Sequence, residues 1–373
     1  MHRVTGVVLA AALAGGSCFV ALAPGAAATS SSTVVPVVCG ATLTHNTTLT
    51  HDLHCTTGPG LILLGNITLN LGGHGIYGPG STFPGYDAIL IQRGATPTVT
   101  NGRIQKWLDG INGSAFGGGA YGLNVSHVTF TQVGTAIVAA NGTYNVTNST
   151  FSEDGYGLYG NDAFDTVTHS SFYQVGTSIG IWSGGDITAS YDSFTAPTGP
   201  SNQSVFGVEN SEGGSSVDHS SFHNIKTAIS SWFGPENLSN VTITGATTAY
   251  AADYFGGGTL TNVVFSHNIT GIALDTISKV TVSHGTFEFN GNSIYLQPGN
   301  GLPSTISVAS STFYKNLGDG VNLDVPGSSL KSVQAIDNAG HGISAIAGTL
   351  DLGGNRAHGN ATSPQCVGVV CTP

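Results

Sequence analysis

Acidic and aromatic residues recur at one position of a repeated pattern in the second half of the chain. The pattern is anchored by apolar residues in short alternating runs: Ile179, Phe206, Ile229, Tyr250, Ile272, Ile294 and Val321. Three residues beyond each anchor stand, in order, Trp182, Glu209, Trp232, Asp253, Asp275, Gln297 and Asp324. If the anchors face a core, this column of tryptophans and carboxylates is expected to project outward.

Aromatic rings beside carboxylates suit the recognition of sugars, because ring faces stack on sugar C–H groups while carboxylates accept hydrogen bonds from hydroxyls. Two carboxyl groups about 5 Å apart suit a retaining glycoside hydrolase, and a separation of about 6.5–9.5 Å suits an inverting one. The column predicts three catalytic carboxylates and three substrate contacts: Glu209, Asp253 and Asp275, and Trp182, Trp232 and Asp324. A solvated face without chemistry would show the same residues, and a shift of one residue in register would reverse every side chain.

Metal-binding groups are sparse in this pattern. Asp253 and Asp275 are expected on neighbouring coils and offer the oxygen ligands that Ca²⁺ prefers; no other cofactor and no defined metal site is predicted. A second column, three residues before recurring phenylalanines, holds imidazoles and amides: His127, Asn148, His169, His219, Asn262 and His284. Because no carboxylate repeats beside these histidines, we interpret this column as a ladder of turns rather than as a metal site.

A repeat of about 21 residues must position these columns. Phe130, Phe151, Phe172 and Phe194 follow one another at intervals of 21 or 22 residues, each at the end of a short run rich in Val, Thr and Ser. Short alternating runs bounded by Gly, Asn and Ser are strands, and a fixed period near 20 indicates stacked coils. The sequence therefore predicts an all-β fold, a single-stranded right-handed parallel β-helix of roughly a dozen coils between Leu43 and Leu352.

Both ends of the repeat carry further motifs. Near the start stand Cys39-Gly-x-Thr-Leu-Thr and Leu69-Asn-Leu-Gly-Gly-His-Gly-Ile, and near the end stand Gly354-Asn-Arg-Ala-x-Gly-Asn360 and Gln365-Cys366. These segments resemble secreted bacterial right-handed β-helix proteins with a pectin-lyase-like fold, and the resemblance covers nearly the whole chain. It implies the fold but no particular enzyme family, because the Asp-Asp pair of polygalacturonase-like hydrolases is absent from the sequence.

The N-terminal residues have the features of an export signal. Arg3 precedes an apolar stretch that ends at Pro24-Gly25, and a small-residue cleavage pattern follows at residues 26–28. We expect a signal peptide at residues 1–28 and a β-helix domain at residues 29–373. Four cysteines remain in that domain: Cys39, Cys55, Cys366 and Cys371. Four cysteines allow three pairings, and pairing within each end is favoured because the two groups lie far apart in the sequence.

Charge and composition limit the function. The chain has 9 Lys and Arg against 20 Asp and Glu, a net charge of −11, which excludes nucleic acid as a partner. We expect a secreted, extracellular protein with no stable membrane insertion after signal cleavage; no oligomeric state is predicted. The favoured prediction is a non-catalytic surface or binding protein whose partner is a polysaccharide or a cell-envelope glycan. The alternative is a polysaccharide-active enzyme that uses the acidic and aromatic column.

Overall fold

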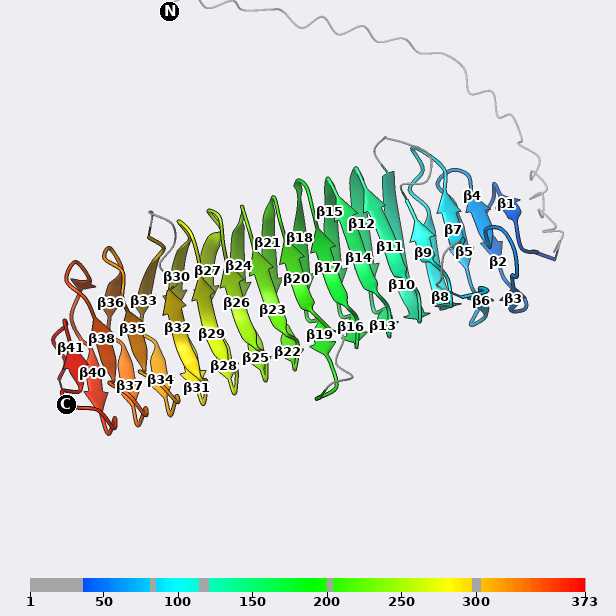
Figure 1. The fold of residues 1–373 in the computed structure, drawn as a ribbon. Coiled ribbons are helices and arrows are strands. Elements are labelled where there is room, and N and C mark those ends of the chain that lie inside the picture. The colour runs from blue at the N-terminus through cyan, green and yellow to red at the C-terminus, as the bar shows by residue number, and fades with distance from the viewer. Residues whose placement is uncertain (1–35, 81–84, 114–120, 200–203, 297–302, 373) are drawn as a thin grey trace, which may run out of the picture. The chain divides into compact units, whose positions relative to one another are not determined.

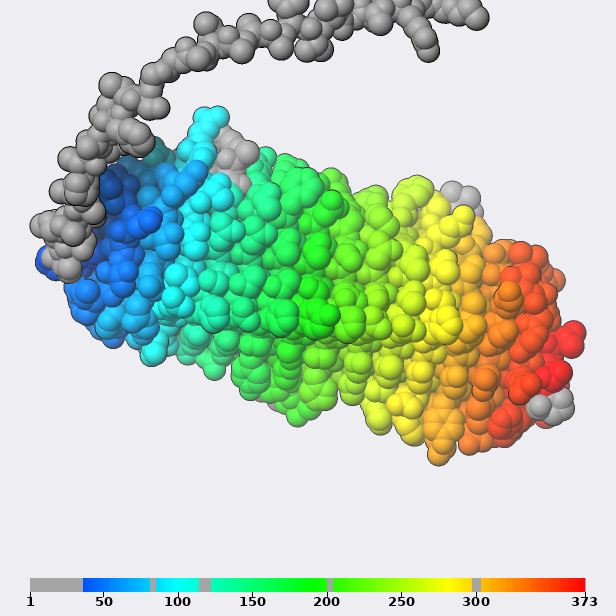
Figure 2. Space-filling view, turned by 180° about the vertical axis from the view of Figure 1, so that it is seen from behind, coloured from blue at the N-terminus to red at the C-terminus, as the bar shows by residue number. Residues whose placement is uncertain are grey.

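The structure is a computed structural model, and it describes residues 36–80, 85–113, 121–199, 204–296 and 303–372. The signal peptide predicted at residues 1–28 and Gln297 of the column lie outside the described residues. In the described ranges the chain forms strands and turns and no helix, and every strand pair is parallel. The coils stack along one axis, and Figure 2 shows them as successive bands of colour.

One side of each coil belongs to sheet A. Its twelve strands are β1 (Ala41–Leu43), β4 (Leu61–Leu63), β7 (Asp87–Ile91), β9 (Asp109–Asn112), β11 (Thr135–Ala140), β14 (Tyr156–Asn161), β17 (Thr177–Ile181), β20 (Phe206–Asn210), β23 (Thr227–Ser231), β26 (Thr248–Ala252), β29 (Thr270–Leu274) and β32 (Asn292–Leu296). A three-stranded sheet continues this side with β35 (Val321–Leu323), β38 (Ile343–Ala345) and β41 (Cys366–Val367).

The remaining strands form sheet B, which bends into two arms. The first arm contains β2 (Thr47–Thr48), β5 (Thr68–Asn70), β8 (Thr98–Gln105), β10 (Tyr121–Thr131), β12 (Gly142–Thr147), β15 (Ala163–Thr168), β18 (Gly185–Ser190), β21 (Gly214–Asp218), β24 (Pro235–Ser239), β27 (Gly257–Thr261), β30 (Lys279–Ser283), β33 (Thr305–Ala309), β36 (Ser329–Lys331) and β39 (Leu350–Asp351). The second arm contains β3 (Leu53–His54), β6 (Gly75–Tyr77), β13 (Thr150–Ser152), β16 (Ser171–Tyr173), β19 (Ser193–Thr195), β22 (Ser221–His223), β25 (Thr242–Thr244), β28 (Val264–Ser266), β31 (Thr286–Glu288), β34 (Thr312–Tyr314), β37 (Gln334–Ile336) and β40 (Arg356–His358). The long strands β8 and β10 pass through both arms, and Figure 1 shows the coils side by side.

The predicted phenylalanine repeat is a buried stack. Successive rings from Phe130 to Phe172 lie 5.0 and 4.5 Å apart, nearly parallel, and Phe194 and Phe222 continue the stack at 4.4 Å. Ile243 fills the same position in the coil between Phe222 and Phe265. Because stacked side chains of one type bury apolar surface against each neighbouring coil, this column stabilises the coils between Phe130 and Phe313.

The column of His and Asn residues lies at the corner between the two arms of sheet B. Its six members have φ values between 46° and 56°, in the left-handed region, where Asn and His are enriched among residues other than glycine. His169 and His219 stack on either side of Tyr191, at 5.0 and 4.9 Å. The column therefore forms a ladder of turns, as its composition predicts.

Disulfides close both ends of the described chain. Cys39 is bonded to Cys55 and Cys366 to Cys371, with Cα–Cα distances of 5.6 and 6.2 Å. The predicted pairing within each end is confirmed.

Candidate functional site

The predicted column follows the carboxyl ends of the sheet A strands, along the edge that is uppermost in Figure 1. Each backbone N–H there donates to the preceding coil: Trp232 to Asn210, Asp253 to Ser231, and Asp275 to Ala252. Trp232, Asp253 and Asp275 therefore occupy one position on three successive coils. Trp182 holds the same position two coils before Trp232, and Asp324 follows β35 beyond Asp275.

Asp253 and Asp275 are a pair of half-buried carboxylates on adjacent coils. Each accepts a hydrogen bond from the next backbone N–H, Tyr254 and Thr276 respectively, at 2.8 Å. Burial raises the pKa of Asp253, and the neighbouring charge of Asp275 raises it further against the opposing bond from Tyr254. Asp253 thus keeps its proton to a higher pH than an isolated aspartate, which is the property a general acid needs.

Four exposed aromatic side chains lie along the same edge, on the coil of Asp253 and on the coil before it: Trp232, Phe233, Tyr254 and Phe255, here called the aromatic edge. Tyr254 contacts both Trp232 and Phe233, with ring centroids 6.0 and 5.9 Å apart. Tyr254 and Phe255 have φ values of 45° and 72°, a conformation that costs bulky residues free energy and that tends to occur at functional sites. The aromatic edge therefore presents exposed ring faces next to two carboxylates.

Glu209 does not belong to the column, which corrects its predicted placement. Sheet A strands contain two consecutive inward residues, such as Gly207 and Val208, so Phe206 faces outward and Val208 is the counterpart of Ile179. Glu209 is consequently paired with Gly180 on one side and Ser230 on the other, two residues before the edge. It lies on the outer face of sheet A.

Glu209 covers Gly180 together with Trp182. The point where any other residue at position 180 would carry its Cβ lies 4.0 Å from both Glu209 Oε2 and Trp182 Nε1. On the preceding coil, Tyr159 pairs with Gly180, and its ring centroid is 6.4 Å from that of Trp182. We call Tyr159, Gly180, Trp182 and Glu209 the Gly180 site. Burial raises the pKa of Glu209, which is only 6% exposed, whereas Trp182 is 48% exposed.

The same face carries polar residues that sequence reasoning did not identify. Asp87 and Asp109 are directly paired on neighbouring strands, and the Asn112 amide donates to both carboxylates at 3.2 Å. Burial and the charge of Asp87 raise the pKa of Asp109 to about 6. Their spacing of one coil is visible in the sequence, but no phenylalanine marks the register in that part of the chain.

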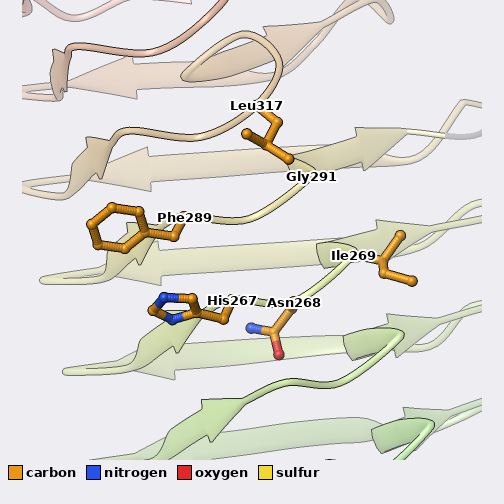
Figure 3. A pocket seen from close by; sticks show the side chains of 6 residues that line it. All are labelled: His267, Asn268, Ile269, Phe289, Gly291 and Leu317. Atoms are coloured by element: carbon orange, nitrogen blue, oxygen red, sulfur yellow. The ribbon is translucent and has the colours of Figure 1, made fainter. Parts of the chain in front are cut away.

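Figure 3 shows a shallow hollow on a different edge, at the turns that precede β29, β32 and β35. His267 and Phe289 stack there at 4.9 Å, beside the exposed side chains of Ile269 and Leu317. None of the predicted site residues lines this hollow.

Metal and membrane features can be stated for the described ranges only. There, no group of three or more His, Cys, Asp and Glu side chains is arranged to hold a metal ion. Calcium binding by Asp253 and Asp275 stays a prediction. No helix in the described part of the chain is long and apolar enough to cross a membrane.

Comparisons with known proteins agree on the fold. Residues 227–372 match the family described as "Right handed beta helix region". A search of curated proteins finds no match. Among solved structures, the catalytic unit of a thermostable GH87 alpha-1,3-glucanase from Streptomyces thermodiastaticus is similar at 12% identity and a TM-score of 0.53, over 84% of this chain and 64% of that one.

Two further structures are more distant. The catalytic domain of a GH87 alpha-1,3-glucanase in complex with nigerose gives 13% identity and a TM-score of 0.31, over 82% of this chain and 64% of that one. The tailspike protein 3 of bacteriophage CBA120 gives 12% identity and a TM-score of 0.28, over 89% of this chain and 56% of that one. This chain thus spans less than two thirds of each of these proteins.

The fold prediction is confirmed: the chain is an all-β, right-handed parallel β-helix consistent with a pectin-lyase-like fold, and its described residues form about 14 coils.

Proposed function

We propose that this protein is a secreted, extracellular glycan-binding β-helix that holds a polysaccharide along the outer face and upper edge of sheet A. The observation that carries the proposal is a row of aromatic rings, the half-buried Tyr159 and the exposed Trp182, Trp232 and Tyr254, beside carboxylates on the same or adjacent coils. Neighbouring coils lie about 4.8 Å apart, so Trp182 and Trp232 are separated by about 10 Å along the axis. Rings at this spacing suit every second sugar of one extended chain.

The two disulfides support an extracellular location, because such bonds persist in oxidising compartments. The similar Streptomyces structure is named as an alpha-1,3-glucanase, so this fold is compatible with glycan ligands.

Single alanine variants of Trp182 and Trp232 test the binding proposal. An aromatic contact contributes about 0.5–1.5 kcal/mol beyond its buried area, so each variant should weaken polysaccharide binding by about tenfold. Affinity electrophoresis against a panel of soluble polysaccharides measures the change. Tyr173→Ala is the matched control, because Tyr173 is 45% exposed but lies in sheet B. If all three variants bind like the wild type, the aromatic row is not the binding surface.

A second function, glycan hydrolysis, is favoured by the carboxylate pair Asp253 and Asp275 on adjacent coils. One acid with a raised pKa beside another that shares its edge is the arrangement of an acid and a nucleophile or base. If the protein releases oligosaccharides from any bound polysaccharide, Asp253→Asn should lower the rate at least 100-fold, because it removes the proton donor. Release of reducing ends is the measurement. Wild-type binding without release would leave the protein as a binding module alone.

A further inference from the structure

Glu209 is a largely buried residue whose carboxylate has no partner among the described residues. It is 6% exposed, and no hydrogen bond or ion pair with any described residue reaches it. The ion pairs in the described chain are confined to two His–Asp contacts, His74 with Asp52 and His219 with Asp218. Neither Glu209 oxygen is among the fully enclosed unpartnered atoms, so the carboxylate keeps some contact with water. Partial burial still disfavours its ionised form unless a counter-charge compensates it. A positively charged group bound at the Gly180 site would therefore stabilise the ionised form of Glu209.

The surrounding face contributes no such charge. None of the strands of sheet A, nor of the three-stranded sheet that continues it, contains Lys or Arg, whereas three of them contain Asp87, Asp109 and Glu209. Sheet B, in contrast, has basic residues in four strands: Arg103, Lys279, Lys331 and Arg356. Lys226 lies immediately before β23, at the end of that strand away from Trp232. A polyanionic glycan would meet like charges on this face, so the ligand is neutral or cationic.

The aromatic rings favour a cationic ligand over a neutral one. Trp182 stands beside the carboxylate, and Tyr159 lies next to Trp182 on the preceding coil. A cation over an aromatic face gains about 0.5–2 kcal/mol, more where water is excluded. A sugar hydroxyl could donate a hydrogen bond to Glu209 but would leave its charge uncompensated. A protonated amine does both, because it donates a charge-assisted hydrogen bond and faces the rings.

We propose that the Gly180 site binds the protonated amino group of an amino-sugar polymer, with Glu209 as its counter-ion and with Trp182 and Tyr159 as ring walls. This inference rests on the proposed glycan binding and specifies its ligand class.

Two oligosaccharides of equal length test the proposal. A glucosamine hexamer carries free amines, and an N-acetylglucosamine hexamer has the same backbone without them. Isothermal titration of the whole protein at pH 6 should show at least tenfold tighter binding of the glucosamine hexamer, and this preference should weaken as salt is added. Glu209→Gln should abolish the preference while keeping shape and hydrogen bonding.

Two further variants sharpen the measurement. Glu288→Gln removes a carboxylate from sheet B and should leave the preference unchanged. Gly180→Ala places a methyl group beneath Glu209 and Trp182, 3.1 Å from Thr177 Cγ2, and should weaken the glucosamine hexamer about tenfold with the fold retained by circular dichroism. If Glu209→Gln fails to fold, the binding of the glucosamine hexamer to Gly180→Ala still tests whether the Gly180 site holds the ligand.

Each contrary outcome has a distinct meaning. Equal affinity for the two hexamers, or a preference that survives Glu209→Gln, overturns the amine assignment and leaves glycan binding in place. Capture of polylysine with neither hexamer bound would also overturn it, since the occupant would then be a basic peptide. Failure of both hexamers and of every neutral polysaccharide in the panel would remove the proposed function together with the inference.

Discussion

Single buried carboxylates make this β-helix sensitive to pH. Glu236 is fully buried, its position on the neighbouring coils is held by Ser215 and Gly258, and neither of its oxygens has a partner among the described residues. Burial raises the pKa of Glu236 well above its ordinary value. The pKa of the nearby Tyr250 is raised by burial and also by the charge of Glu236. The folded protein therefore holds a proton on Glu236 that the unfolded chain releases near pH 4.3.

Proton linkage gives the direction in which the free energy of unfolding changes with pH. A group protonated in the folded state and ionised in the unfolded state lowers the free energy of unfolding by about 1.4 kcal/mol for each pH unit above its unfolded pKa, until the folded pKa is reached. Asp154, with a pKa raised by burial to about 8, and Asp165, raised by burial to about 7, act in the same direction. Stability should thus fall from pH 5 to pH 8.

Glu236→Gln should reduce that slope by about 1.4 kcal/mol per pH unit, because an amide does not titrate. Denaturant unfolding at pH 5, 6, 7 and 8 measures it, with Glu288→Gln as the control whose curve should parallel the wild type. Parallel curves for both variants would mean that Glu236 is ionised in the folded protein.

At the scale of elements, the sequence predicts the coils well and the register of sheet A only in part. Phenylalanine spacing locates most coils of the middle of the chain, because one ring type stacks along the second arm of sheet B, across the longer connection between Phe194 and Phe222 as well. In sheet A the simple alternation fails, since two consecutive residues face inward in its longer strands, for example Ala136 and Ile137. The alternating pattern therefore predicts that the apolar side chain of Phe206 faces the core, whereas it faces outward in the structure.

The outcome for the site follows from the same feature. Trp182, Trp232, Asp253 and Asp275 are placed correctly, because each stands at a fixed distance after an inward residue that the alternation identifies. Glu209 lies outside the column because Val208, and not Phe206, is the inward counterpart of Ile179. The sequence does not identify Tyr159 and Gly180 as site residues. A glycine leaves room for a ligand only between larger side chains, and the pairing of Gly180 with Tyr159 and Glu209 is known only from the structure.

At the scale of the molecule, a stack of coils loses stability locally, because each coil contacts only its neighbours. The bond between Cys366 and Cys371 closes the last coil, where β41 pairs with β38. A loop this short is stabilised by about 2 kcal/mol in the chain-entropy account. Replacing both cysteines with serine should therefore accelerate hydrogen exchange in β38 and β41, while the exchange of β14 to β29 and the binding of glycans stay as in the wild type.

The exposed side chains of Leu350 and Val370 lie at the same end, so the loosened end should also promote end-to-end association, measured by light scattering. The single replacement Cys366→Ser, which leaves a free thiol, separates loss of the bond from disulfide exchange. Faster exchange along the whole of sheet A, with weaker glycan binding, would show instead that the coils unfold as one cooperative unit and that the end of the stack governs the site.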